Sequence, residues 1–415
     1  MTAASLSPTQ REALARLDSR ADELLEFARL LIATPSPNPP GDERAVAAVV
    51  VERLRALGVA DVDMPGDRPE RPNVIANLPG SHGEPSLILS GHLDTKPVGD
   101  ESAWNRDPFG AEVVNGELHG LGSGDMKAAV AAMVYAAGVL AELGLRGKLQ
   151  LVFTADEEAG SVHGSQWLAG SGRLHADVAV IGEPCGIVRE WEAIDVLSRG
   201  AALYKVIVRG DQMHSSISDR LTMVNATVAM ARLIDRMSRE LKGHLRYEPH
   251  PLVPLGPTVN VGVMVKGGVF YGVNPGLAEF ACDLRTLPGM TRESVEEDLQ
   301  AFLELAMHDD PELRAKLCLE IWVPATEMDA GHPVVAALRD AARTVLGEVL
   351  PVQGFPGSTD ATHFQLTAGV PTVAAFGPGF LPRAHGPNES LAAASVLQAA
   401  KIYALGALAY LGSDN

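Results

Sequence analysis

Hydrophobic residues recur along the chain with two different spacings. Up to about residue 33, and again over residues 43–57, they return every three or four positions, which predicts amphipathic helices. The proline-rich segment 34–41 separates these two regions. Short apolar runs that predict buried strands then alternate with an alanine-rich helix; the strands cover residues 74–78, 87–90, 149–154 and 178–181, and the helix covers 126–143. This alternation predicts a mostly parallel sheet covered by helices.

The pattern changes near residue 199. The segment that follows predicts strands at 201–208, 258–265, 278–284 and 317–323, with helices at 221–241 and 291–307. The order β-α-β-β-α-β is that of the ferredoxin-like plan. After residue 325 the first pattern resumes, with a helix at 334–346, a strand at 372–376 and a helix from Ser390. We therefore predict an α/β fold: a doubly wound, mostly parallel-sheet catalytic domain formed by residues 1–198 and 325–415, with a ferredoxin-like α+β domain inserted at 199–324.

Composition and charge narrow the possible partners. With 34 basic and 52 acidic residues the formal net charge is −18, which argues against nucleic acid and against an anionic membrane surface as partners. No run of eighteen apolar residues predicts a membrane span, and no signal peptide is recognised at the N-terminus, so a cytoplasmic protein is expected. The three cysteines form no CxxC pair, which disfavours a disulfide framework or a zinc ribbon.

Five short segments place histidine or carboxylates directly after predicted strands or in loops. Functional sites in open α/β sheets gather at the edge formed by the carboxyl ends of the strands. The residues that stand out are His92 with Asp94, Asp125 after a glycine-rich stretch, the run Asp156-Glu157-Glu158, Glu183, and His385. Residues two apart in extended chain share a face, and a metal-bound imidazole usually donates its second N–H to an acceptor, so His92 and Asp94 suit a ligand and its orienting carboxylate.

Each segment also has an ordinary interpretation. A histidine at a strand end can pair with a surface aspartate, and three consecutive carboxylates can form a solvated acidic run. The glycines before Asp125 follow GxGxG rather than GxGxxG, and Lys127 does not complete a P-loop, so nucleotide binding is disfavoured. Taken together, the two histidines and three of these carboxylates (Asp125, Glu158 and Glu183) suit zinc, cobalt or manganese as a ligand set. A pair of such ions is a known hydrolytic device.

The segments GHLDT, GSGDMK, TADEEAGS, IGEP and AHGPNE, in that order over residues 91–389, resemble the co-catalytic zinc peptidase and aminoacylase family. This family includes acetylornithine deacetylase, succinyl-diaminopimelate desuccinylase, glutamate carboxypeptidase and aminoacylase. The resemblance implies two metal ions, one held by His92, Asp125 and Glu183 and the other by Asp125, Glu158 and His385. It also implies Glu157 as general base and Asp94 as the carboxylate that orients His92.

The resemblance further assigns roles to the inserted domain, as a lid and as a dimerisation domain of a homodimer. His214 matches a histidine that polarises the scissile carbonyl and that in relatives arrives from the partner subunit. Asn274 and Arg285 match residues that grip a substrate carboxylate, although Arg285 alone also suits a strand arginine paired with Asp283. Gly357 and Ser358 match a substrate-contacting loop.

The chain departs from the family pattern at a few positions without losing a ligand or the base. Lys96 stands where relatives carry a small apolar residue; pointing inward it would favour an acidic acyl group, and pointing outward it would be a solvated surface lysine. Leu121 replaces a common arginine, and no proline follows His214 at the usual offset.

The expected activity is hydrolysis of the amide bond of an N-acyl amino acid, as by a deacetylase or desuccinylase. The attacking hydroxide would bridge two divalent metal ions, zinc or else cobalt or manganese, and Glu157 would act as its base. Two alternatives remain open: a carboxypeptidase or dipeptidase acting on short peptides with a free carboxylate, and a binding protein that kept the fold without catalysis.

Overall fold

The computed structural model describes residues 6–413, which form two compact units. The first unit takes in the chain up to Leu197, Glu327–Phe355 and the chain from Thr359 onward; the second takes in Ser198–Thr326 and Pro356–Ser358. The first unit is therefore discontinuous in sequence.

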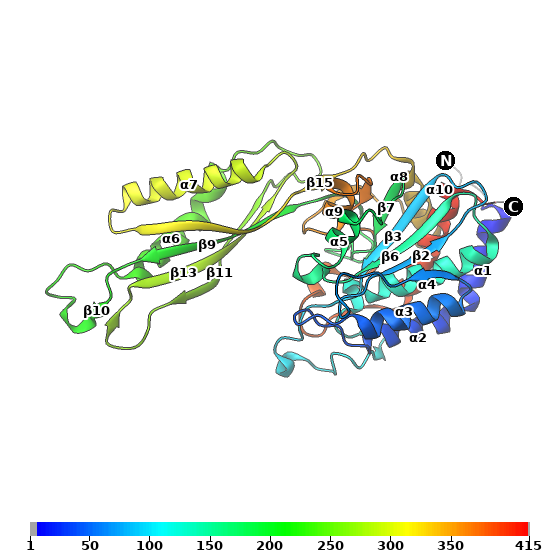
Figure 1. Cartoon of the computed structure of the whole chain (residues 1–415), viewed down its shortest axis with the longest axis horizontal. Helices are drawn as coiled ribbons and strands as arrows, with labels where there is room; N and C mark the ends of the chain where they lie inside the picture. The colour runs from blue at the N-terminus through cyan, green and yellow to red at the C-terminus, as the bar shows by residue number, and fades with distance from the viewer. Residues whose placement is uncertain (1–5, 414–415) are drawn as a thin grey trace. The chain divides into compact units, whose positions relative to one another are not determined.

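The first unit is built on a six-stranded sheet with the order β1-β2-β6-β3-β7-β17 (Figure 1). Strands β6, β3, β7 and β17 run parallel, whereas β2 is antiparallel to both β6 and β1. Their bounds are Asp61–Asp63 for β1, Val74–Leu78 for β2, Ser86–His92 for β3, Lys148–Thr154 for β6, Val178–Ile181 for β7 and Thr372–Val373 for β17. The mostly parallel central sheet predicted from the apolar runs is confirmed.

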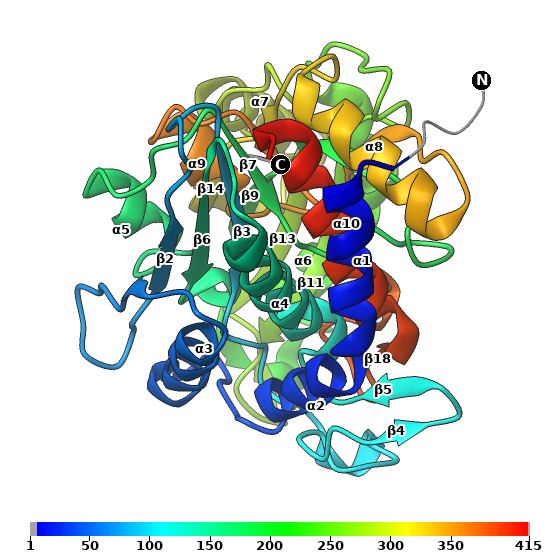
Figure 2. The same ribbon diagram turned by 90° about the vertical axis from the view of Figure 1, so that its right-hand side faces the viewer.

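Helices cover both faces of this sheet, as the doubly wound prediction requires. On one face α4 (Ala128–Leu143) and α10 (Ala393–Leu411) pack on each other, and α1 (Pro8–Ser19) and α8 (Pro333–Leu346) pack on α10 (Figure 2). On the other face Leu168 of α5 (Ser165–Gly170) and Phe364 of α9 (Ala361–Leu366) join sheet residues such as Ile88 and Ile181 in one apolar cluster. The helices α2 (Ala21–Ile32) and α3 (Arg44–Ala56) complete this unit.

Two of these helices are long and apolar enough to cross a membrane. They are Ser123–Leu143, which includes α4, and Ala393–Leu411, and 83% and 67% of their apolar windows lie buried inside the fold. Because they pack on each other and against the sheet, their apolar surface is covered by protein. Their composition is that of core helices in a large α/β unit.

Some predicted boundaries were wrong. The first helical region is two helices, α1 and α2, which meet at Arg20. The predicted strand 372–376 is a strand only over Thr372–Val373, and Ala375 beyond it forms an isolated bridge with Asp195. The C-terminal helix starts at Ala393 because Ser390–Ala392 forms β18 against β5 (Glu117–His119), which in turn pairs with β4 (Val113–Val114).

The second unit has the predicted strand and helix order. Strands β9 (Gly200–Arg209), β11 (Thr258–Gly267), β13 (Leu277–Thr286) and β14 (Arg314–Val323) form a sheet in the order β11-β13-β9-β14, and α6 (Ala226–Glu240) and α7 (Arg292–Asp309) pack against it (Figure 1). Alternate residues of β9 and β13 are buried, as expected for a sheet covered on one face. The same unit contains a separate two-stranded sheet, in which β10 (Met213–His214) pairs antiparallel with β12 (Val273–Asn274).

Three short strands make a further small sheet with the order β15-β8-β16. These are β15 (Thr326–Glu327), β8 (Ile194–Ser198) and β16 (Val352–Phe355).

Candidate metal centre

The sheet register brings the predicted ligands of the first unit to one edge. His92 ends β3 directly opposite Thr154, the last residue of β6, and Ser90 lies opposite Ile181, the last residue of β7. The loops that leave these strands carry Asp94, Glu157 with Glu158, and Glu183. Parallel pairing alone therefore places the three loops side by side, at the carboxyl edge where sites in such sheets form.

The Asp125 carboxylate lies between two imidazoles. Its Oδ1 is 2.9 Å from His92 Nε2, and its Oδ2 is 3.0 Å from His385 Nε2. His385 Nε2 is also 3.1 Å from Glu158 Oε2. Asp125 thus presents one oxygen toward each histidine, which is the arrangement required of a carboxylate that bridges two ions.

The proton on His92 has a defined place. His92 Nδ1 is 2.9 Å from the backbone carbonyl oxygen of Asp94, and because a carbonyl only accepts, Nδ1 carries the hydrogen. The other ring nitrogen, Nε2, is directed at Asp125 and lies 3.7 Å from Glu183 Oε1. Because Nδ1 is held by the carbonyl, Nε2 is the ring nitrogen that would be presented to a metal ion.

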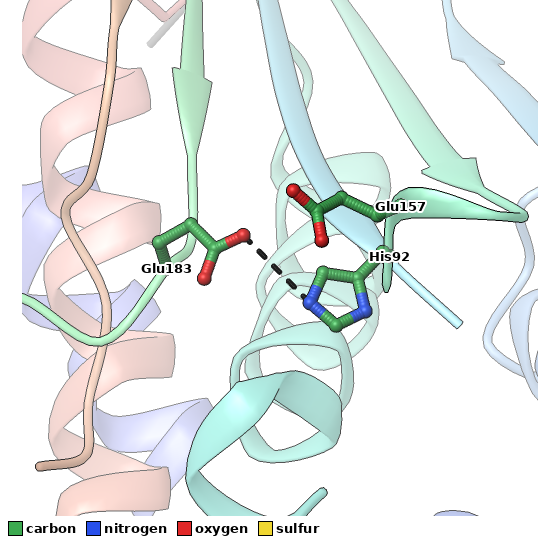
Figure 3. A group of neighbouring side chains, drawn as sticks. All are labelled: His92, Glu157 and Glu183. Carbon is green, nitrogen blue, oxygen red and sulfur yellow. Dashed lines mark ion pairs between the residues drawn. The ribbon is translucent and has the colours of Figure 1, made fainter. Parts of the chain in front are cut away.

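Two groups of described side chains bring potential ligand atoms within 4.8 Å of one another. One is His92, Glu157 and Glu183, and the other is His92, Asp125 and Glu158. Figure 3 shows the first group converging on one point, with Glu157 and Glu183 directed toward the ring of His92. His92, Asp125, Glu158 and Glu183 are all buried, whereas the side chain of His385 is half exposed.

Electrostatics in this cluster call for a cation. Burial raises the pKa of Glu157 and that of Glu183 well above the ordinary glutamate range, and Asp125 adds to the shift at Glu183. Burial alone would lower the pKa of His92, but its hydrogen bond to Asp125 and the charge of Glu183 raise it well above the ordinary value. So many buried carboxylates within a few ångströms repel one another, and divalent cations would relieve that repulsion. Oxygen and imidazole donors together fit zinc, cobalt or manganese.

The Asp94 carboxylate holds the loop that carries the predicted base. Its Oδ1 accepts the backbone N–H of Glu157 at 3.2 Å and its Oδ2 accepts that of Glu158 at 3.1 Å. The same Oδ1 lies 3.6 Å from His92 Nδ1, farther than the carbonyl of its own residue. In this structure Asp94 orients His92 through its backbone and positions the two glutamates through its side chain.

Lys96 points into the acidic cluster. Its Nζ lies 3.1 Å from Glu158 Oε2 and also donates to the backbone oxygen of Glu158, with the side chain about one-third exposed. Between the two orientations considered from the sequence, the inward one is found.

Glu389 is a site residue that sequence reasoning passed over, although it ends the AHGPNE segment. It is buried, and its carboxylate accepts the backbone N–H groups of Gly122, Gly124 and Asp125 at 2.8–3.1 Å. The glycine-rich stretch therefore wraps a buried carboxylate, which fixes the backbone from which Asp125 projects. Because 264 residues separate Glu389 from Asp125, no local pattern could reveal the contact.

The remaining predicted residues lie in the second unit, where each has a defined local contact. His214 is exposed and pairs across β10 and β12 with Val273, next to the pair Met213 and Asn274. Asn274 is buried, and its amide donates to the backbone oxygens of Asp211 and Val224 at 2.7 and 3.1 Å. Arg285 forms an ion pair with Asp283, in which Nη2 donates a hydrogen bond to Oδ2 at 2.8 Å and Nε lies 2.8 Å from Oδ1.

Gly357 and Ser358 contact the chain at residues 198–199. The Ser358 hydroxyl donates to the backbone oxygen of Arg199 at 2.9 Å, and the Ser198 hydroxyl lies 3.4 Å from the backbone oxygen of Gly357. Arg199, which sequence reasoning passed over, is half-buried; its Nε has no hydrogen-bond partner among the described residues, and burial together with the charge of Arg285 lowers its pKa. A guanidinium in that state is suited to a carboxylate from outside the chain.

The sequence matches a known protein family over most of its length. The model of Peptidase family M20/M25/M40 matches residues 88–408. The chain belongs to this family. An M20 member of this kind is a hydrolase acting on amide or peptide bonds.

Individual M20 relatives extend the likeness. A succinyl-diaminopimelate desuccinylase of Cereibacter sphaeroides is 38% identical over 229 residues, which are 54% of this chain and 58% of that enzyme. An acetylornithine deacetylase of Proteus mirabilis is 29% identical over 88% of this chain and 91% of its own. The crystal structure of an M20 metallo-carboxypeptidase from Sulfolobus solfataricus has a similar fold, with a TM-score of 0.77 at 20% identity, over 94% of this chain and 98% of that one.

Proposed function

We propose that the chain is a two-metal amidohydrolase that cleaves the amide bond of an N-acyl amino acid, releasing a carboxylic acid and a free amino acid. The observation that carries the proposal is the Asp125 carboxylate, with one oxygen against His92 and the other against His385. A single anion placed between two separate imidazoles has the form of a bridge between two metal ions.

In this proposal His92, Asp125 and Glu183 hold one ion, and Asp125, Glu158 and His385 hold the other. When bound, the ions would polarise the scissile carbonyl and make water nucleophilic near neutral pH. Zinc is the proposed metal, with cobalt or manganese as alternatives, because the donors mix imidazole with carboxylate.

Glu157 is the proposed general base. It accepts the proton of the attacking water and delivers it to the leaving nitrogen, so that no net proton is gained or lost by the enzyme in a full cycle. Burial and the charge of Glu158 raise its pKa above the ordinary glutamate range, which strengthens it as a proton acceptor. Asp94 supports the transfer by holding the backbone amide of Glu157.

The substrate class follows from the named relatives and from the basic groups of the second unit. The relatives named above remove succinyl or acetyl groups from amino acids. Such substrates carry a free carboxylate on the amine side, which Arg285, Asn274, Gly357 and Ser358 are proposed to bind. We add Arg199 to this group, because its half-buried guanidinium has no carboxylate partner of its own among the described contacts.

His214 is proposed to donate a hydrogen bond to the scissile carbonyl oxygen. Its Nδ1 accepts the backbone N–H of Ser216 at 3.2 Å, so the ring hydrogen lies on Nε2. Nε2–H is then the free end that can donate to charge developing on an oxygen. We also propose that the protein is a cytoplasmic homodimer and that His214 acts in the site of the partner subunit, as the family resemblance implies.

A substrate screen tests the proposal. The zinc-reconstituted protein is offered N-acetyl, N-succinyl and N-carbamoyl amino acids alongside dipeptides, and released amine is measured. We expect turnover of at least one N-acyl amino acid with kcat/KM roughly tenfold or more above any dipeptide. Preference for dipeptides would instead support the alternative of a dipeptidase or carboxypeptidase.

A further inference from the structure

A buried arginine contacts the loop that carries Glu157 and belongs to none of the five segments that supply the candidate metal ligands. Arg71 comes from the connection before β2, and its side chain is only 6% exposed. Its Nη2 lies 2.6 Å from Asp156 Oδ1, and its Nε lies 2.9 Å from Glu43 Oε2. Arg71 therefore joins α3 at its N-terminal end to the residue immediately before the proposed base.

Asp156 has a different role from its two acidic neighbours. It is absent from both ligand groups of the described residues, and its carboxylate contacts Arg71, the Asn38 amide at 3.0 Å and the backbone N–H of His163 at 3.1 Å. Its backbone has φ +64°, a left-handed conformation that most side chains avoid. The contacts of the Asp156 side chain hold its backbone in this conformation. That conformation in turn sets the direction in which the Glu157 side chain projects.

Asn38 links the Asp156 carboxylate to the Asp94 carboxylate. Its side-chain nitrogen donates both to Asp156 Oδ1 and, at 2.8 Å, to Asp94 Oδ2. Asp94 in turn accepts the amides of Glu157 and Glu158. The loop is thus held from two sides, by Asp94 through its backbone amides and by Arg71 and Asn38 through Asp156. We call these contacts the clamp, and Arg71 is its cation.

The route of the Arg71 side chain depends on a glycine. A Cβ on Gly41 would lie 1.5 Å from Arg71 Nη1, so any side chain there would displace the guanidinium. Glu43 is fully buried and contacts the guanidinium at Nε, whereas Asp156 contacts it at Nη2. Burial and the charge of Asp94 raise the pKa of Glu43 to about 8, even though Arg71 lowers it. The surroundings of Arg71 thus contain more carboxylate than one guanidinium can neutralise.

We propose that Arg71, seated over Gly41 and held by Glu43, is a positioning residue that fixes Glu157 for proton transfer by anchoring Asp156. The inference rests on the proposed function of Glu157 as base. Arg71 touches neither a candidate metal ligand nor Glu157 in the described contacts, so its effect reaches the chemistry only through the Asp156 turn. Loss of the clamp would then lower kcat, while the metal ligands and the substrate-binding groups stay in place.

Two independent changes remove the clamp. Arg71→Gln removes the charge and leaves buried Glu43 and Asp156 without their partner, which also costs stability. Gly41→Ala leaves every charge present but drives the guanidinium away. Gly58→Ala is the matched control: Gly58 has a similar φ of +85°, but nothing lies within 4 Å of its Cβ. It therefore carries the same backbone strain without the displacement.

The experiment measures kcat, KM and bound metal for the zinc-loaded wild type, Arg71→Gln, Arg71→Lys, Gly41→Ala, Gly58→Ala and Glu157→Gln. We expect Arg71→Gln and Gly41→Ala to lose roughly 10–100-fold in kcat, with KM and metal content within about twofold of wild type. Arg71→Lys should fall between, because an ammonium cannot make the two-ended contact of a guanidinium. Gly58→Ala should resemble wild type.

Two outcomes would overturn the inference. One is a kcat for Gly41→Ala equal to that of Gly58→Ala. The other is a loss of bound metal that accounts for the loss of rate, since Arg71 would then support the ligands rather than the base. Failure of the proposed function is separately visible, because wild type would be inactive on the N-acyl amino acids, or Glu157→Gln would be as active as wild type.

Discussion

At the scale of single residues, the Asp125 carboxylate organises the site by dividing its two oxygens between two imidazoles. Burial would raise its pKa, but hydrogen bonds from His385 and His92 lower it, so the group stays an anion. For an anion this deeply buried, only strong partners compensate for lost hydration. The histidines meet that need in the structure, and in the proposed enzyme the metal ions would meet it more completely.

Lys96 leads to a prediction about substrate choice. Its ammonium lies against Glu158 in the acidic cluster, where it would meet the distal carboxylate of an N-succinyl group. Lys96→Met removes the charge at similar length, and we expect kcat/KM for an N-succinyl substrate to fall roughly tenfold relative to the matching N-acetyl substrate. Lys96→Arg is the control and should keep the preference. Equal losses on both substrates would show that Lys96 serves Glu158 and not the acyl group.

Sequence reasoning proposed several of the candidate ligands because they end a predicted strand or follow one by a few residues. His92, Glu157 with Glu158, and Glu183 lie at that edge once the strands pair in parallel. Arg71 and Glu389 could not be found that way. Their contacts with Asp156 and Asp125 span 85 and 264 residues. Arg71 lies outside the five family segments, and Glu389 ends one of them without a local pattern that reveals its partner. Such contacts depend on tertiary packing.

At the scale of elements, strands were predicted more closely than helix ends. Residues 74–78 and 178–181 match β2 and β7 at both ends, because continuous apolar runs bounded by turn residues leave little choice. The break at Arg20 was missed because α1 and α2 both keep apolar residues on a buried face. The helix predicted from 221 begins at Ala226, where the side chain of Asn225 caps it by accepting the N–H groups of Thr227 and Val228.

Strand β8 contains a buried carboxyl group that makes stability depend on pH. Burial, with a contribution from Glu192, raises the pKa of Asp195 from 3.8 to about 8. Between these two values the folded chain keeps a proton that the unfolded chain has lost, so stability is full at the acid end and falls as the pH rises. Asn cannot titrate. Asp195→Asn should therefore gain stability relative to wild type by about 1 kcal/mol per pH unit across this window.

Urea unfolding of wild type and Asp195→Asn at about pH 5, 6.5 and 8 measures this difference. A gap between the two free energies of unfolding that stays constant over the three pH values would contradict the assignment of the titrating group.

At the scale of the whole molecule, the second unit carries the proposed dimer contact. Strand β11 is an edge of its sheet, and its residues Val263, Met264 and Val265 are 55–65% exposed. An edge strand with exposed apolar residues tends to pair with another chain. We expect the wild type to sediment as a dimer and Val265→Lys as a monomer. Val188→Lys, at an exposed valine of the first unit, is the control and should remain dimeric.

A dimer that persists in Val265→Lys would place the contact elsewhere, and a monomeric wild type would remove the homodimer from the proposal. In the second case the assignment of His214 to the partner subunit would also fall.

The measurement that tests the central claim most directly is zinc titration of the metal-stripped protein while hydrolysis of an N-acyl amino acid is followed, with Glu157→Gln in parallel. The stripped wild type should be inactive and gain activity up to about two equivalents of zinc. Glu157→Gln should bind the same amount of zinc with kcat lowered by roughly 100-fold or more. Full activity without metal, saturation of both binding and rate at one equivalent, or an active Glu157→Gln would contradict a two-metal hydrolase with Glu157 as its base.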